Sequence, residues 1–127
     1  MPIASKISTL WVVVLFNMGF ADILSFMVPD FMSQILTGEV EGVVITPLFL
    51  LVAAIFIEVA IVMIYASRAL SPRASRRANL GAAAVTILFI VGGGSLTPHY
   101  IFFALVEVIT LLYIVFLAWT WRETMAA

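Results

Sequence analysis

The 127-residue chain contains no cysteine, which excludes disulfide bonds, thiolate metal centres, iron–sulfur clusters and cysteine catalysis. Charged residues are scarce too, because only 10% of the chain is Asp, Glu, Lys or Arg, against about 25% in ordinary soluble domains. Six basic and seven acidic residues nearly balance, which leaves no basic surface for nucleic acid. Hydrophobic residues make up 65% of the sequence, and this composition indicates an integral membrane protein.

The few charges divide the apolar sequence into segments long enough to cross a bilayer. A hydrocarbon core about 30 Å thick requires about 20 helical residues. The expected transmembrane helices lie near residues 8–28, 47–67, 78–95 and 98–121. An amphipathic segment at 30–37 is expected to lie in the membrane interface. The predicted fold is therefore all-α: a polytopic membrane protein in which residues 1–127 form a single four-transmembrane-helix bundle.

The basic residues all fall on one side of this predicted bundle. They are Lys6, Arg68, Arg73, Arg76, Arg77 and Arg122. Cytoplasmic loops of membrane proteins are enriched in Lys and Arg, so the pattern predicts that both the N- and the C-terminus are cytoplasmic. The loops on the opposite side carry acids and His99 instead.

The second and fourth predicted helices share a sequence pattern. Each begins with a Thr-Pro pair, Thr46-Pro47 or Thr97-Pro98, and each carries one glutamate followed by valine. Threonine at the N-cap and proline at the first helical position favour a helix start, because the N–H that proline lacks would have no intrahelical partner. Glu58 follows its proline by eleven residues and Glu107 by nine, so the pattern indicates only a weak two-helix repeat.

Three acids within the predicted spans are the main candidates for function. No Lys or Arg lies at the depth of Asp22, Glu58 and Glu107. A rise of about 1.5 Å per residue places both glutamates near the bilayer midplane and Asp22 in the outer half. An ionised acid at the bilayer centre costs roughly 2.5–3.5 kcal/mol. If the three acids meet, we expect that some hold protons at neutral pH, or that a proton, a metal ion or an organic amine binds between them.

Other polar residues complete the candidate ligand- or proton-binding set. Asn17 lies one to two helical turns from Asp22, and Tyr65 shares a helix face with Glu58. His99 lies at the outer mouth of the last predicted helix. No catalytic, metal-binding or phosphate-binding motif accompanies these residues, so we predict no catalytic residues, no bound metal and no cofactor.

These residues favour a membrane protein that binds a proton-linked or cationic, partly apolar small ligand, as a small transporter does. So short a chain is expected to form a homodimer if it encloses a pathway. Two alternatives remain open. In the first, the chain is an accessory or structural subunit of a larger membrane complex, and the acids form hydrogen bonds between helices. In the second, it is an intramembrane isomerase-like enzyme acting on a lipid, although the absence of a catalytic motif favours a role other than catalysis.

Several segments resemble an uncharacterised bacterial family of small four-helix integral membrane proteins. The resemblance rests on residues 10–11, 17, 21–22, 58–70, 76–79 and 100–107. The likeness covers nearly the whole chain, and the chain is also similar to DoxX-like proteins in size and helix count. The family has no assigned function, so the resemblance implies the fold and a place in the bacterial cytoplasmic (inner) membrane, without a mechanism.

Overall fold

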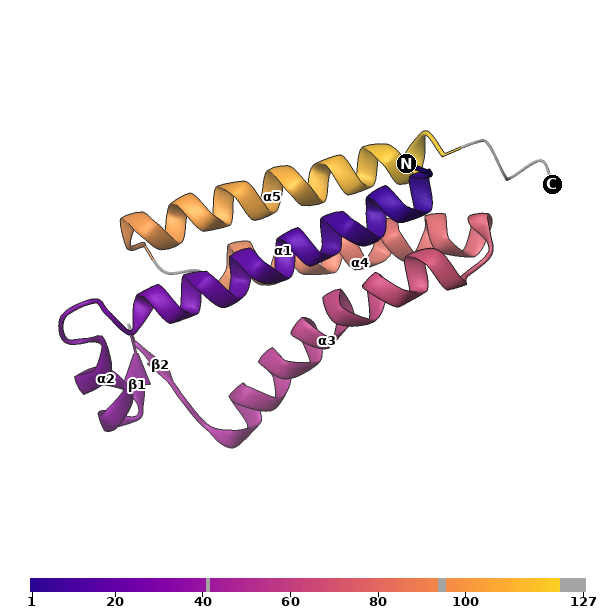
Figure 1. The fold of residues 1–127 in the computed structure, drawn as a ribbon. Coiled ribbons are helices and arrows are strands. Elements are labelled where there is room, and N and C mark those ends of the chain that lie inside the picture. Colours follow the sequence, from indigo (N-terminus) through magenta and orange to yellow (C-terminus); the bar gives the residue numbers. More distant parts are fainter. Residues whose placement is uncertain (41, 94–95, 122–127) are drawn as a thin grey trace.

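In the computed structural model, helices form most of the chain (Figure 1). The structure describes residues 1–40, 42–93 and 96–121, so Glu41, Gly94, Ser95 and the segment from Arg122 onward lie outside it. Four helices of 22 or 23 residues are long and apolar enough to cross a membrane. They are α1 (Ile3–Ser25), α3 (Pro47–Ala69), α4 (Pro72–Gly93) and α5 (Pro98–Trp119). The four pack as a bundle, which confirms the predicted architecture.

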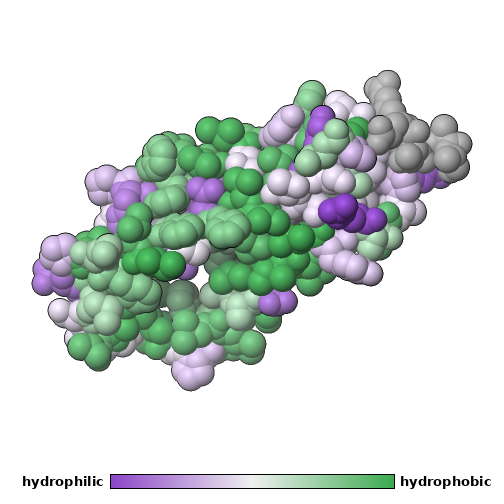
Figure 2. Space-filling view, in the orientation of Figure 1, coloured by the Kyte–Doolittle hydropathy of each residue, from purple (hydrophilic) through white to green (hydrophobic). Residues whose placement is uncertain are grey.

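The four long helices form a closed ring of contacts. Both α1 and α4 pack against α3 and α5. The core consists of apolar side chains from all four helices, and its largest fully buried members include Trp11, Leu111 and Ile114. Hydrophobic side chains also cover most of the outer surface in Figure 2. An apolar surface of this extent is unfavourable in water and ordinary in lipid, so the surface fits a bilayer environment.

One end of the bundle carries the described basic residues, and we call it the basic end. The start of α1, the end of α3, the start of α4 and the end of α5 meet there (Figure 1). Its basic residues are Lys6, Arg68, Arg73, Arg76 and Arg77. The opposite end contains the shorter elements that connect α1 to α3.

Helix α3 stays close to its neighbours only near the basic end. Its buried residues are Ala60, Met63 and Ser67, all in the second half of the helix. Towards its first residues, α3 diverges from α1 (Figure 1), although Phe56 still stacks on Phe89 of α4 with a ring-centroid distance of 4.9 Å. The divergence leaves one side of α1 open, and the space-filling view shows a gap beside it (Figure 2).

Helix α4 begins earlier than the sequence predicts. We expected a helix from residue 78, because the preceding arginines are typical of a loop, but α4 starts at Pro72. Pro72 suits the first helical position, and the Ser71 hydroxyl accepts a hydrogen bond of 3.4 Å from the Ala74 N–H. The arginines therefore extend from a helix whose polar first turns lie at the basic end. α1 also differs, spanning 3–25 instead of 8–28.

The connection between α1 and α3 contains a short helix and a hairpin. α2 (Phe31–Thr37) lies within the segment expected at the interface. The strands β1 (Glu39–Val40) and β2 (Val43–Val44) pair antiparallel, and the sequence analysis did not predict them. Gly42, in the turn between them, has φ 81°, which glycine adopts at no steric cost. The connection ends at Thr46, whose hydroxyl accepts a 3.1 Å hydrogen bond from the Phe49 N–H and so caps α3 as predicted.

Candidate functional site

The contact between α1 and α5 brings together two of the three predicted acids. Glu107 of α5 is buried, with only 4% of its surface exposed. Asp22 of α1 is close enough for the two carboxyl groups to interact electrostatically, although Asp22 itself is exposed. We call these residues the acid pair. Its two members come from the first and the last helix, so the fold and not sequence proximity creates it.

No basic side chain of the described residues accompanies the acid pair at its depth. Arg76 contacts Trp119, which lies twelve residues after Glu107 on α5, or about 18 Å along the helix axis. Lys6 precedes Asp22 by sixteen residues on α1, which corresponds to about 24 Å. The acid pair therefore lies in a region of the bundle that lacks a protein counter-charge among the described residues.

His99 fixes the start of α5 to the end of α1. Its Nε2 lies 3.1 Å from Ser25 Oγ, and the Ser25 hydroxyl donates a second bond of 2.8 Å to the Ala21 carbonyl. A serine hydroxyl has one proton, so His99 Nε2 is the donor in the first bond. His99 precedes Glu107 by eight residues, or about 12 Å along α5, and it lies beyond hydrogen-bonding distance of that carboxyl group. The histidine therefore positions the two helices that carry the acid pair.

The structure does not bring the remaining candidate residues into this site. Asn17 Nδ2 donates a 2.8 Å bond to the Val13 carbonyl of its own helix. Tyr65 is 76% exposed, and Glu58 is exposed as well. The three acids therefore do not form one cluster. Asp22 and Glu107 form a pair, and Glu58 lies separately on α3.

Helix rotation explains the position of Glu58. Ala60, Met63 and Ser67 face the bundle interior. At about 100° per residue, Glu58 lies about 140–200° around the helix from these three positions. It therefore points away from the core and from the acid pair.

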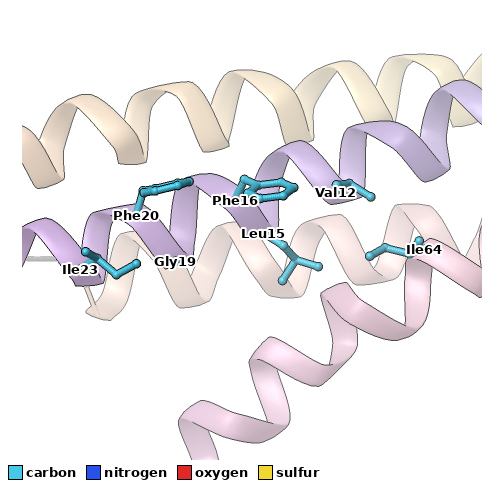
Figure 3. Close-up of a pocket in the computed structure, with 7 residues that line it drawn as sticks. All are labelled: Val12, Leu15, Phe16, Gly19, Phe20, Ile23 and Ile64. Carbon is cyan, nitrogen blue, oxygen red and sulfur yellow. The ribbon is translucent and has the colours of Figure 1, made fainter.

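An apolar pocket adjoins the acid pair on the open side of α1. Its volume is about 420 Å³, and Figure 3 shows the side chains that line it. They are Val12, Leu15, Phe16, Gly19, Phe20 and Ile23 of α1 and Ile64 of α3. Asp22 follows Gly19 by three residues on α1, and helix residues at this spacing lie about 5–6 Å apart. Asp22 therefore lies within one helical turn of the pocket, although it is not among the residues that line it.

A buried polar network at the basic end is the feature that the sequence analysis missed. Asn79 of α4 is fully buried, and its Oδ1 accepts bonds from Trp11 Nε1 of α1 at 2.7 Å and from Ser67 Oγ of α3 at 3.2 Å. Its Nδ2 donates to the backbone and side-chain oxygens of Ser75 at 2.9 and 3.2 Å. One amide group thus joins three helices.

Two further contacts strengthen the same end. The Ser8 hydroxyl of α1 donates a 2.7 Å bond to the Ile64 carbonyl of α3. The Arg76 guanidinium lies 4.9 Å from the ring centre of Trp119, a cation–π distance that links α4 to α5. The sequence signal for this end was the spacing of Ser75 and Asn79 on α4, because residues four apart share a helix face.

The described residues offer no group of three or more His, Asp or Glu side chains that could hold a metal ion. The acid pair therefore supplies at most two carboxylates, and His99 binds Ser25 instead of completing a ligand set. The chemistry that the site supports is the binding of positive charge next to an apolar surface.

Four apolar spans around a common core, with the buried acid Glu107 among them, define a multi-pass membrane protein of the helical-bundle class. The chain belongs to a family of unknown function, DUF6326, whose model matches residues 4–127. This membership confirms the expected family of unknown function, while the bacterial origin and the likeness to DoxX-like proteins stay predictions. No curated protein matches the chain, and no solved structure does.

Proposed function

We propose that this protein binds a small organic cation, with the positive group at the acid pair and an apolar substituent in the adjacent pocket. The observation that carries the proposal is the burial of Glu107 at 4% exposure beside Asp22, without a basic residue at that depth in the described chain. Intramembrane acids without a protein counter-charge are costly, and they typically mark binding sites for ions or substrates. A bound cation would offset this cost.

The pocket favours an apolar cation over a bare metal ion. The seven residues that line it are Gly19 and six with apolar side chains. Phe16 and Phe20 stack there with their ring centroids 6.3 Å apart, and aromatic faces attract cations through their π electrons. An ammonium or phosphonium compound with aryl or alkyl groups matches this combination of acid pair and aromatic pocket.

The proposed setting is the bacterial inner membrane, with the basic end in the cytoplasm. Five described basic residues gather at that end, as the positive-inside pattern requires. The acid pair then lies in the outer half of the bundle, and the divergence of α3 opens the pocket towards lipid. We propose that cation binding there is one step of transport, with proton exchange at the carboxyl groups as its coupling.

The test uses purified protein in nanodiscs and tetraphenylphosphonium as the probe. Binding by the wild type is compared with that by Glu107→Gln and Asp22→Asn. Removing one carboxylate from a partly buried site is expected to weaken binding about ten- to hundredfold, because charge-assisted contacts contribute about 1.5–3 kcal/mol. Glu58→Gln is the matched control, since it removes an acid of similar depth that points away from the site.

Equal affinities of the wild type and Glu107→Gln would overturn the proposal. So would an equal loss in Glu58→Gln, which would indicate nonspecific attraction of the cation to membrane acids. Uptake of the probe into proteoliposomes then tests transport, and a binding-competent protein without uptake would limit the proposal to binding.

A further inference from the structure

The exposed side of α3 carries a carboxyl group at a depth where the bilayer offers it no partner. We call this side the Glu58 face, and its exposed residues are Leu51, Ala54, Glu58, Ile61, Val62 and Tyr65. Glu58 follows Pro47 by eleven residues, so it lies about 16 Å along the helix and close to the middle of the span. Ionisable side chains at this depth are rare and almost always face protein or a water-filled cavity.

The polar groups of the Glu58 face have no hydrogen-bonding partner within the described part of the chain. Neither the carboxyl group of Glu58 nor the hydroxyl of Tyr65 has a hydrogen bond or ion pair to another described residue. The contacts that α3 makes with α1 and α4 use its other side, through Ala60, Met63 and Ser67. The Glu58 face is therefore free to pack against a second molecule.

The exposed side of α5 provides a comparison within the same molecule. Its exposed residues from Ile101 to Leu112 are apolar, as contact with lipid chains requires. They are Ile101, Phe102, Leu105, Ile109 and Leu112. An apolar helix face needs no partner in a bilayer, whereas a face with a central carboxyl group does.

We propose that the Glu58 face is the interface of a parallel homodimer, in which two copies of α3 pack about a two-fold axis along the membrane normal. Copies inserted in the same orientation bring equal residues to equal depth, so Glu58 faces its counterpart in the second copy. A protonated carboxyl group has both a donor and an acceptor. Two such groups can satisfy each other, which makes the face self-complementary and favours a second copy over a different protein.

The spacing of the face suits helix pairing. Leu51, Glu58 and Tyr65 are seven residues apart, with Ala54 and Ile61 between them. This alternation of three and four residues produces the seam of a left-handed helix pair crossing at about +20°. The small side chain of Ala54, one turn from Glu58, lets the two backbones approach closely.

Cysteine cross-linking tests the interface directly, because the natural chain contains no cysteine. Ala54→Cys and Ile61→Cys each place one thiol on the proposed seam, and Ile109→Cys places one on the apolar face of α5, where Ile109 is 66% exposed. In dilute proteoliposomes under mild oxidation, we expect disulfide-linked dimers from at least one seam variant and only collisional background from Ile109→Cys. Equal yields from all three variants would overturn the proposal.

A second measurement examines the carboxyl group itself. Single-molecule photobleaching in liposomes gives the dimer fraction of the wild type, Glu58→Gln and Glu58→Leu. An interhelical hydrogen bond in a membrane shifts an association equilibrium by about three- to thirtyfold, so Glu58→Leu is expected to dissociate by that factor. Glu58→Gln keeps a donor and an acceptor and should stay closer to the wild type. A monomeric wild type, or undiminished dimerisation of Glu58→Leu, would refute the interface.

This inference is independent of the proposed cation site. The substituted residue points outward, so Glu58→Leu is expected to leave the fold and tetraphenylphosphonium binding unchanged. Loss of dimerisation with intact binding in Glu58→Leu therefore supports the interface alone, whereas loss of binding with intact dimerisation in Glu107→Gln supports only the acid pair.

Discussion

Replacing Asn79 by alanine should destabilise the packing of the three helices that its side chain joins at the basic end. Its amide accepts hydrogen bonds from Trp11 on α1 and Ser67 on α3, at 2.7 and 3.2 Å. In Asn79→Ala, the indole N–H and the serine hydroxyl lose this acceptor in a fully buried environment. The variant thus removes contacts between three helices at once, and it adds no charge or bulk.

The expected loss follows from these bonds. Interhelical hydrogen bonds in membrane proteins contribute about 0.6 kcal/mol each on average. A buried donor left without an acceptor costs about 1–3 kcal/mol more. For the bonds from Trp11 and Ser67 together, Asn79→Ala should lower the free energy of unfolding by about 3–7 kcal/mol.

Reversible unfolding in mixed detergent micelles, followed by circular dichroism, measures this difference. Asn17→Ala is the matched control, because Asn17 bonds only to Val13 of its own helix at 2.8 Å among the contacts described. Changes away from a buried network usually stay within about 0.5 kcal/mol, so the control should lie close to the wild type. Equal stabilities of Asn79→Ala and Asn17→Ala would refute the importance of the network.

Three other predictions concern single contacts. Thr46→Ala removes the acceptor for the Phe49 N–H, 3.1 Å away, and should lower the free energy of unfolding by about 1 kcal/mol; an unchanged unfolding midpoint would contradict the cap. Arg76→Ala removes the guanidinium 4.9 Å from the Trp119 ring and should cost about 0.5–1 kcal/mol in the same assay, whereas Arg76→Lys should retain part of this energy. Gly19→Leu fills the pocket, because a Cβ at this position meets no atom within 4 Å. The variant should therefore bind tetraphenylphosphonium about tenfold more weakly. Unaltered binding would show that the aryl groups of the probe lie elsewhere.

The number and order of the spans followed from the sequence because charges are so rare in it. The ends of the helices were harder to predict where charged residues belong to the first turns of a helix. Arg73, Arg76 and Arg77 indicated a loop, yet Pro72 begins a helix whose long basic side chains can reach water at the membrane surface. Hydropathy alone cannot distinguish a charged loop from a charged first turn.

The site was predictable only in part, because a helix's rotation depends on its packing. Glu58 and Glu107 lie at similar depth, but they follow their prolines by eleven and nine residues. A difference of two residues rotates a side chain by about 200°, which is enough to turn one acid inward and the other outward. The Asn79 network escaped prediction because its members lie on three helices. The spacing of Ser75 and Asn79 predicts a shared face of α4, but it does not identify the helices opposite that face.

The unequal attachment of α3 has a consequence for motion. Hydrogen bonds hold its last turns to α1 and α4, while its first half has few buried side chains. Rigid-body swinging of the first half, with the polar network as a pivot, would therefore change its separation from α1 without breaking any of those bonds, while Ile64 at the pocket stays in place. Helix motions of this kind occur in microseconds to milliseconds, so the open side of α1 is expected to change its width on that time scale.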